Sequence, residues 1–189
     1  MQTFVKTVLL PVLAVSAFAQ SAPPPQDNPM STWLRNAYMG NRNTIVRTAE
    51  KMPEEFYDLR PGAQQEVRTF GQQVGHLANY NFLWCSQAKG EKNPNSANLE
   101  KLGTKAEFMK ALNDAFVYCE GVYTALTDAS GTQMVDITME NGQQRRNLRL
   151  GLLTLNYGHN NEIYGSMVTY LRIKNIVPPA SEPRTGQKK

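Results

Sequence analysis

Four long stretches of the sequence place apolar residues three and four positions apart, which is the spacing of one face of an α-helix. The stretches cover residues 31–52, 64–86, 104–126 and 145–174. Amphipathic helices of this length bury their apolar faces most readily against one another. The sequence therefore predicts an all-α fold, a four-helix bundle.

Local signals mark the ends of several helices. Pro53 follows the first helix and Pro178 closes the fourth, because proline lacks the amide hydrogen that continuing a helix requires. Thr104 and Glu107 have the spacing of a capping box, so the third helix is expected to begin there. The fourth helix is expected to bury one stripe of side chains, made of Leu148, Leu152, Leu155, His159, Ile163, Ser166 and Tyr170.

Two connections interrupt the helical pattern. Residues 87–103 are rich in glycine, proline and asparagine and are long enough for a crossover along the bundle. Residues 129–144 contain the pair Asn141 and Gly142, which is common in tight turns. This second connection is either a loop or a short hairpin, and the sequence leaves both alternatives open.

Cys85 and Cys119 are the only cysteines. An even cysteine count in an exported protein favours a disulfide, although two buried thiols that never meet remain the alternative. If the second and third helices were antiparallel neighbours, the two cysteines would lie about 22 Å apart at 1.5 Å per residue. A disulfide therefore requires the two helices to run in parallel, which predicts an up-down-down-up order with a long crossover.

The first 19 residues have the composition of a secretory signal peptide. Lys6 precedes an apolar run, and the small residues Ala17 and Ala19 suggest cleavage after Ala19. The apolar run is too short to span a bilayer. The expected organisation is a signal peptide over residues 1–19, a proline-rich spacer over 20–30, the bundle over 31–181 and a disordered tail over 182–189. We expect a periplasmic or secreted protein without a membrane span.

The charge balance argues against a nucleic-acid partner. The formal net charge is +4, and without the signal peptide and the tail the remaining part carries about +1. Arg145, Arg146 and Arg149 form the only local basic cluster, which is interpreted as the solvated start of the fourth helix.

Several common catalytic signatures are absent from the sequence, among them G-x-S-x-G, the phosphate-binding glycine loops and H-E-x-x-H. Glu50, Glu54 and Glu55 are interpreted as a solvated helix end. Four tyrosines near the histidines could line a pocket, but at helical spacing ordinary packing is the preferred interpretation. They are Tyr80, Tyr157, Tyr164 and Tyr170.

Four segments, taken together, resemble the DinB-like (DinB/YfiT) superfamily of four-helix-bundle proteins, and its exported members in particular. They read GQQVGHLANYNFLWC, GEKNP, FVYC and HNNEIYGSMVTYLRIKNIVPPAS. The resemblance covers most of residues 33–181, and the last segment is the most specific. It implies a divalent metal site formed by three histidines, one from the second helix and an H-x-x-x-H pair from the fourth.

Transferred to this chain, the resemblance makes His76 the first ligand and His159 the second, whereas Ile163 occupies the third position. Catalytic zinc sites keep three protein ligands, so two imidazoles leave Zn²⁺, Ni²⁺ or Mn²⁺ underligated. Glu162 is the candidate that would complete a two-histidine, one-carboxylate set. Asn79 is the next candidate. The alternative is a pair of hydrogen-bonded core histidines in a site that has lost its metal.

Two functions remain open at this stage. The resemblance implies a metal-dependent transferase or hydrolase, since some relatives transfer thiol cofactors such as mycothiol or bacillithiol. A non-catalytic bundle that binds a small molecule or a protein partner asks less of the residues present, because the histidine triad is incomplete. A homodimer is compatible with either function.

Overall fold

The computed structural model describes residues 27–139 and 141–183. The predicted signal peptide, spacer residues 20–26 and tail residues 184–189 lie outside the described residues. Among the described residues, no helix is both long enough and apolar enough to cross a membrane.

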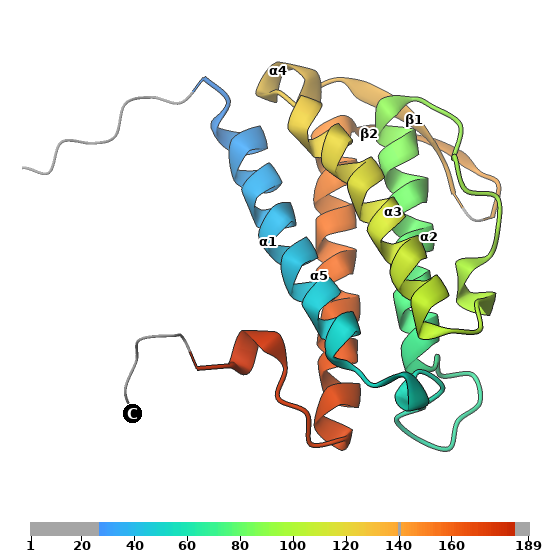
Figure 1. Cartoon of the computed structure of the whole chain (residues 1–189). Helices are drawn as coiled ribbons and strands as arrows, with labels where there is room; N and C mark the ends of the chain where they lie inside the picture. The colour runs from blue at the N-terminus through green and yellow to red at the C-terminus, as the bar shows by residue number, and fades with distance from the viewer. Residues whose placement is uncertain (1–26, 140, 184–189) are drawn as a thin grey trace, which may run out of the picture.

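Four long helices make up most of the described chain, namely α1 (Pro29–Lys51), α2 (Phe70–Lys89), α3 (Lys105–Ala125) and α5 (Arg149–Ile173) (Figure 1). Helices α2 and α3 pack against each other. In addition, α2 contacts α5 and α3 contacts α1. The helical class predicted from the sequence is confirmed, with the addition of a small hairpin. The elements are α1 (Pro29–Lys51), α2 (Phe70–Lys89), α3 (Lys105–Ala125), α4 (Asp128–Gly131), β1 (Met134–Thr138), β2 (Gln144–Leu148) and α5 (Arg149–Ile173), with 3-10 turns at Glu54–Phe56, Leu99–Lys101 and Pro179–Ser181.

The capping box that begins α3 is confirmed. The Thr104 hydroxyl accepts a hydrogen bond from the Glu107 amide at 3.2 Å, and the Glu107 carboxylate accepts one from the Thr104 amide at 2.9 Å. The start of α1 is capped differently, because the carboxylate that accepts from its first amides comes from α4. Asp128 accepts from the amide of Ser31 at 2.7 Å and from that of Met30 at 3.2 Å.

Helix α2 begins at Phe70, six residues after the expected start at residue 64. A second capping box sets this boundary, since the Thr69 hydroxyl accepts from the Gln72 amide at 3.2 Å and the Gln72 side chain accepts from the Thr69 amide at 2.9 Å. Before it, the Arg60 guanidinium donates to the carbonyl of Val67 and holds the chain in a non-helical loop. Apolar spacing alone did not reveal this cap.

Strands β1 and β2 pair as an antiparallel hairpin, which is one of the two alternatives left open by the sequence. Gly142 occupies the turn with φ of 80°, a left-handed conformation that glycine adopts without strain. The expectation that Arg145 and Arg146 begin the fourth helix is wrong, because both belong to β2 and pair with β1. The helix starts at Arg149 instead.

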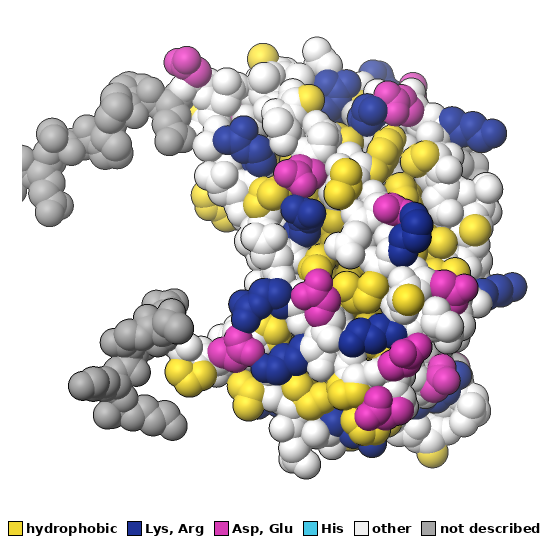
Figure 2. Space-filling view, in the orientation of Figure 1, with side chains coloured by type: hydrophobic (Ala, Val, Ile, Leu, Met, Phe, Trp, Pro, Cys, Tyr) yellow, Lys and Arg dark blue, Asp and Glu magenta, His cyan; other side chains and the backbone are white. Residues whose placement is uncertain are grey.

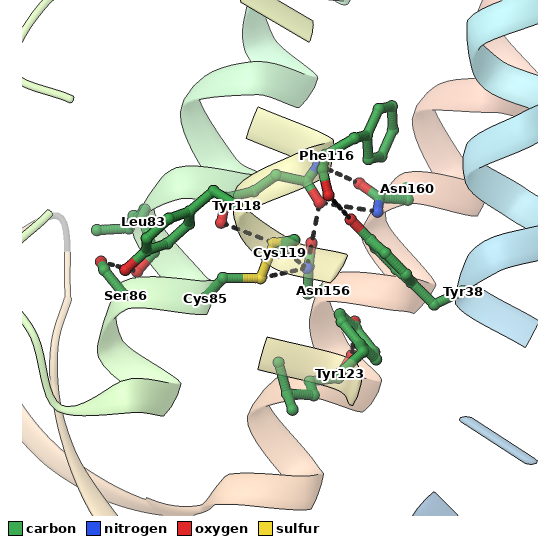
Figure 3. The surroundings of a disulfide bond; sticks show 12 residues. Tyr38, Leu83, Cys85, Ser86, Phe116, Tyr118, Cys119, Tyr123, Asn156 and Asn160 are labelled. Atoms are coloured by element: carbon green, nitrogen blue, oxygen red, sulfur yellow. Dashed lines mark hydrogen bonds between the residues drawn. A yellow bond between two sulfur atoms is a disulfide. The ribbon is translucent and has the colours of Figure 1, made fainter. Parts of the chain in front are cut away.

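The predicted disulfide joins Cys85 of α2 to Cys119 of α3, with Cα atoms 5.4 Å apart. Helices α2 and α3 lie side by side and rise in the same direction in Figure 1, which places the two cysteines at the same level. Figure 3 shows the Asn156 side chain pointing at the bond from α5. Its amide nitrogen lies 3.4 Å from the Cys85 sulfur and 3.6 Å from the Cys119 sulfur.

The buried face of α5 differs from the expected apolar stripe. Leu148 and Leu155 are 46% and 56% exposed, whereas Asn156 and Asn160 are fully buried. Both asparagines donate to the side-chain oxygen of Asn81 of α2, Asn160 at 3.2 Å and Asn156 at 3.3 Å, whereas the side-chain oxygen of Asn156 accepts no hydrogen bond from the described residues. The predicted stripe is therefore right at Leu152, Ile163 and Tyr170 and wrong at Leu148 and Leu155, because part of the buried face is an amide network that apolar spacing does not indicate.

Acidic and basic side chains are interspersed on the face drawn in Figure 2, with no extended basic stripe over α1 and α3. Near the C-terminus, Glu182 pairs with Arg47 and Lys51 of α1, each at 2.5 Å. Ordered chain therefore continues to at least Glu182, the first residue of the predicted tail.

Candidate functional site

The two histidines of the chain lie against each other, one from α2 and one from α5. The ring centroids of His76 and His159 are 5.1 Å apart and the rings meet edge to face. His76 is 5% exposed and the His159 side chain 14% exposed. The pairing of these helices therefore brings together the first two predicted site residues.

Glu100 is a site residue that the sequence did not indicate. One of its carboxylate oxygens lies 2.7 Å from Nδ1 of His76, and the other accepts from Nε of Arg68 at 2.8 Å. Glu100 lies in the crossover, 24 residues after His76. The only sequence signal for Glu100 as a site residue was its carboxylate in a connection that was expected to run along the bundle.

The crossover reaches His76 because α2 has a glycine and an asparagine at the points of contact. A Cβ atom on Gly75 would lie 2.3 Å from the carbonyl oxygen of Leu99, so only glycine permits this approach. The Asn79 side chain accepts from the amide of Leu99 at 3.1 Å and donates to Asn98 at 3.3 Å. Asn79, the candidate ligand named after Glu162, therefore has its side-chain oxygen and nitrogen hydrogen-bonded to the crossover.

The third predicted ligand, Glu162, approaches His159 from α5 itself. A carboxylate oxygen of Glu162 lies 3.7 Å from Nδ1 of His159, and its side chain is 77% exposed. The other ring nitrogen, Nε2 of His159, is buried and makes no hydrogen bond. Since the two nitrogens point to different sides of the ring, Glu162 lies on the side away from this buried atom. Ile163 is 7% exposed.

These residues do not fit a three-ligand metal site. Across residues 27–139 and 141–183, no three His, Cys, Asp or Glu side chains are grouped so that they could hold an ion. Glu100 and Glu162 each lie beside an Nδ1 atom, the position of a carboxylate that orients a histidine. A tetrahedral site would need a further donor near the buried Nε2 of His159, and the position at which the resemblance predicts a third ligand holds the apolar Ile163.

Two aromatic side chains of α2 extend the site outward from the histidines. The Tyr80 ring lies 4.5 Å from His76 and 4.9 Å from His159 between centroids, and the Trp84 ring lies 5.1 Å from His159. Of the other tyrosines considered as pocket residues, Tyr157 and Tyr170 have different partners. Tyr157 packs against Trp33, and Tyr170 donates to the carbonyl of Arg68 at 2.5 Å.

Two hollows flank Tyr80 on this side of α2. The first, here called the amide lobe because asparagines such as Asn79, Asn95 and Asn98 line it, has a volume of about 410 Å³ and lies between α2 and the crossover. The second, here called the hairpin lobe, has a volume of about 450 Å³ and lies between α2 and the hairpin. Its lining includes Trp84 of α2 and Ile137, Met139 and Arg145 of the hairpin region. Tyr80 and Leu83 line both lobes.

The charges at the site are set by burial and by neighbouring groups. Burial raises the pKa of Glu100, but hydrogen bonds from Arg68 and His76 outweigh it, so the pKa lies below its ordinary value. Burial lowers the pKa of His159, and the neighbouring His76 lowers it further, against the opposing effect of Glu162. The site therefore favours an ionised Glu100 and a neutral His159.

Comparison with known proteins agrees with this architecture. A family model of the DinB superfamily matches residues 37–160, which include α2, α3, the hairpin and both histidines. No curated protein matches the chain.

Proposed function

Because the chain belongs to the DinB superfamily, we propose that it binds a small molecule in the cleft beside His76 and His159, without a resident metal ion. In this proposal the four long helices form an up-down-down-up bundle. The bundle supplies a rigid frame, and the crossover and the hairpin supply the walls of the cleft.

The observation that supports the proposal is the buried Ile163, which stands where the resemblance implies a third ligand. With Glu100 and Glu162 both beside Nδ1 atoms, the protein offers a metal two imidazoles and no further donor at the buried nitrogen of His159. The two lobes beside Tyr80 provide the volume that a small molecule requires.

Export is part of the proposal. Cys85 and Cys119 are bonded and fully buried, and structural disulfides persist in oxidising compartments. The signal-peptide composition of residues 1–19 is the second support. Cleavage after Ala19 would leave the proline-rich spacer at the new N-terminus, followed by α1.

Metal binding is the second candidate, and one specific arrangement favours it. Each histidine has a carboxylate beside Nδ1, as ligating histidines do. In this alternative Glu162 would have to swing from solvent to the opposite side of the His159 ring. We derive no reaction from this alternative.

Tryptophan fluorescence tests the proposed ligand site directly. The chain has two tryptophans, Trp33 and Trp84, and Trp33 is 63% exposed on α1. A Trp33→Phe variant leaves Trp84, which contacts His159, as the only reporter. We expect small aromatic probes, namely phenylacetate, phenylacetamide and phenethylamine at millimolar concentration, to include at least one that changes the Trp84 emission saturably. If none does so, and calorimetry detects no binding, the proposed function is wrong.

A further inference from the structure

We propose that the hairpin lobe is the binding site for an organic anion with a flat apolar body, such as an aromatic carboxylate, and that Arg145 holds the anionic group. This inference rests on the proposed function, because it assigns the chemical class of ligand to one lobe of the same cleft.

The apolar body would lie between α2 and the hairpin. Tyr80, Leu83 and Trp84 form the α2 wall, and Ile137 and Met139 form the opposite wall. The Tyr80 and Trp84 rings meet edge to face at 5.2 Å, so each presents a ring surface beside the lobe. A planar ligand buries more area against such walls than a branched one of equal mass.

The hairpin register determines which arginine faces the lobe. Arg145 pairs with Ile137, and Arg146 pairs with Asp136. Paired residues share one face of a hairpin and successive residues alternate between faces. Ile137 is 8% exposed and lines the lobe together with Arg145, so Arg146 and Asp136 lie on the outer face.

The two arginines also differ in their partners. Arg146 forms an ion pair with Asp136 at 3.5 Å, in which both side chains are largely exposed. The Arg145 guanidinium has no ion pair or side-chain hydrogen bond to any described residue, and none of the described residues lining the lobe is acidic. A guanidinium presents a planar fork of donors that matches a carboxylate. Within the described part of the chain, the lobe therefore combines apolar walls with one positive charge that has no acidic partner.

Trp84 connects the lobe to the histidine pair. Its ring lines the lobe, and the centroids of the Trp84 and His159 rings are 5.1 Å apart. An anion bound by Arg145 would therefore place its apolar body beside Trp84, whose ring contacts His159. This contact is what makes Trp84 a direct reporter of binding.

The test compares three probes that share one ring and differ in charge. Phenylacetate, phenylacetamide and phenethylamine are titrated into the Trp33→Phe protein, and binding is followed by Trp84 fluorescence and calorimetry. We expect phenylacetate to bind about tenfold more tightly than phenylacetamide, and Arg145→Gln to remove that difference. Arg146→Gln is the matched control, since it removes the same charge from the outer face, and should retain the preference.

The outcomes separate this inference from the function on which it rests. Equal binding of phenylacetate and phenylacetamide, or equal weakening by the two arginine variants, would overturn the anion site and leave the ligand cleft standing. Preference for phenethylamine would do the same. Absence of binding by all three probes would overturn both.

Discussion

Nδ1 of His76 lies 2.7 Å from a carboxylate oxygen of Glu100, a residue brought from the crossover into contact with α2. The same carboxylate accepts from Arg68, so the loop before α2, the helix and the crossover meet at one group. With Glu100 ionised, His76 places its proton on Nδ1, which orients the ring. The crossover therefore does more than connect two helices, because it fixes a site residue.

Replacing Glu100 by glutamine should weaken this junction. The neutral amide cannot pair with Arg68 and His76 as the carboxylate does, so the free energy of unfolding should fall by about 1 kcal/mol. Urea unfolding at neutral pH measures the change. Glu91→Gln is the control, since the half-exposed Glu91 pairs with the exposed Lys89 and the half-buried Tyr118, and its loss should change stability less.

Gly75→Ala tests the close approach of the crossover. The added methyl group would meet the carbonyl of Leu99 at 2.3 Å, so the crossover must move and the protein should lose about 1 to 3 kcal/mol of stability. Gly121→Ala in α3 meets no neighbouring atom within 4 Å and should instead stabilise the helix by about 0.5 to 1 kcal/mol. Equal effects of the two substitutions in urea unfolding would argue against the close approach.

Removing the disulfide should cost the fold substantially. The bond spans 34 residues of sequence, and the chain-entropy model gives about 3 to 4 kcal/mol for a loop of that length. We expect the double variant Cys85→Ala, Cys119→Ala to unfold at correspondingly lower urea concentration. Reductant should destabilise the natural protein during unfolding and leave the double variant unchanged. A reductant effect of similar size on both proteins would contradict this assignment.

Asp128 should contribute to stability in a pH-dependent way. Backbone hydrogen bonds from Ser31 and Met30 hold the pKa of Asp128 below its ordinary value of 3.8. A carboxyl group with a lowered folded-state pKa stabilises the protein above its unfolded pKa, and this contribution is lost as the pH falls through the folded pKa. Asp128→Asn should therefore be less stable at pH 7, and the difference should shrink below pH 3.8.

Thermal unfolding of the two proteins across this range measures the effect. Other carboxyl groups with lowered pKa, such as Glu107 and Glu182, are present in both proteins and cancel in the comparison. A stability difference that stays constant to the lowest pH would show that Asp128 does not act through its charge.

Much of the fold follows from local sequence signals. Short-range spacing predicted the helical class and the Thr104 cap, and both agree with the structure. The pairing of Cys85 with Cys119, predicted from the even cysteine count of an exported protein, also agrees. The start of α2 was missed because a threonine cap ended the loop later than the apolar pattern suggested. The start of α5 was missed because β2 pairs with a strand whose presence the sequence left open.

The site was predictable only in part, for a physical reason. His76 and His159 are recognisable from the resemblance, and their meeting follows from helix packing. Glu100 and the buried amides of Asn81, Asn156 and Asn160 became visible only in three dimensions. Each of these contacts joins segments far apart in the sequence, and hydrophobic periodicity carries no information about polar groups that satisfy one another inside a core.

Zinc titration of the untagged protein by calorimetry distinguishes a metal-free cleft from a metal site, with Ile163→His and His159→Ala measured in parallel. We expect no stoichiometric binding by the natural sequence, and an affinity at least about 100-fold higher in Ile163→His, because that change completes a three-histidine set. Near-stoichiometric zinc in the natural protein, lost in His159→Ala, would contradict the metal-free cleft and establish a metal site completed by another donor such as Glu162.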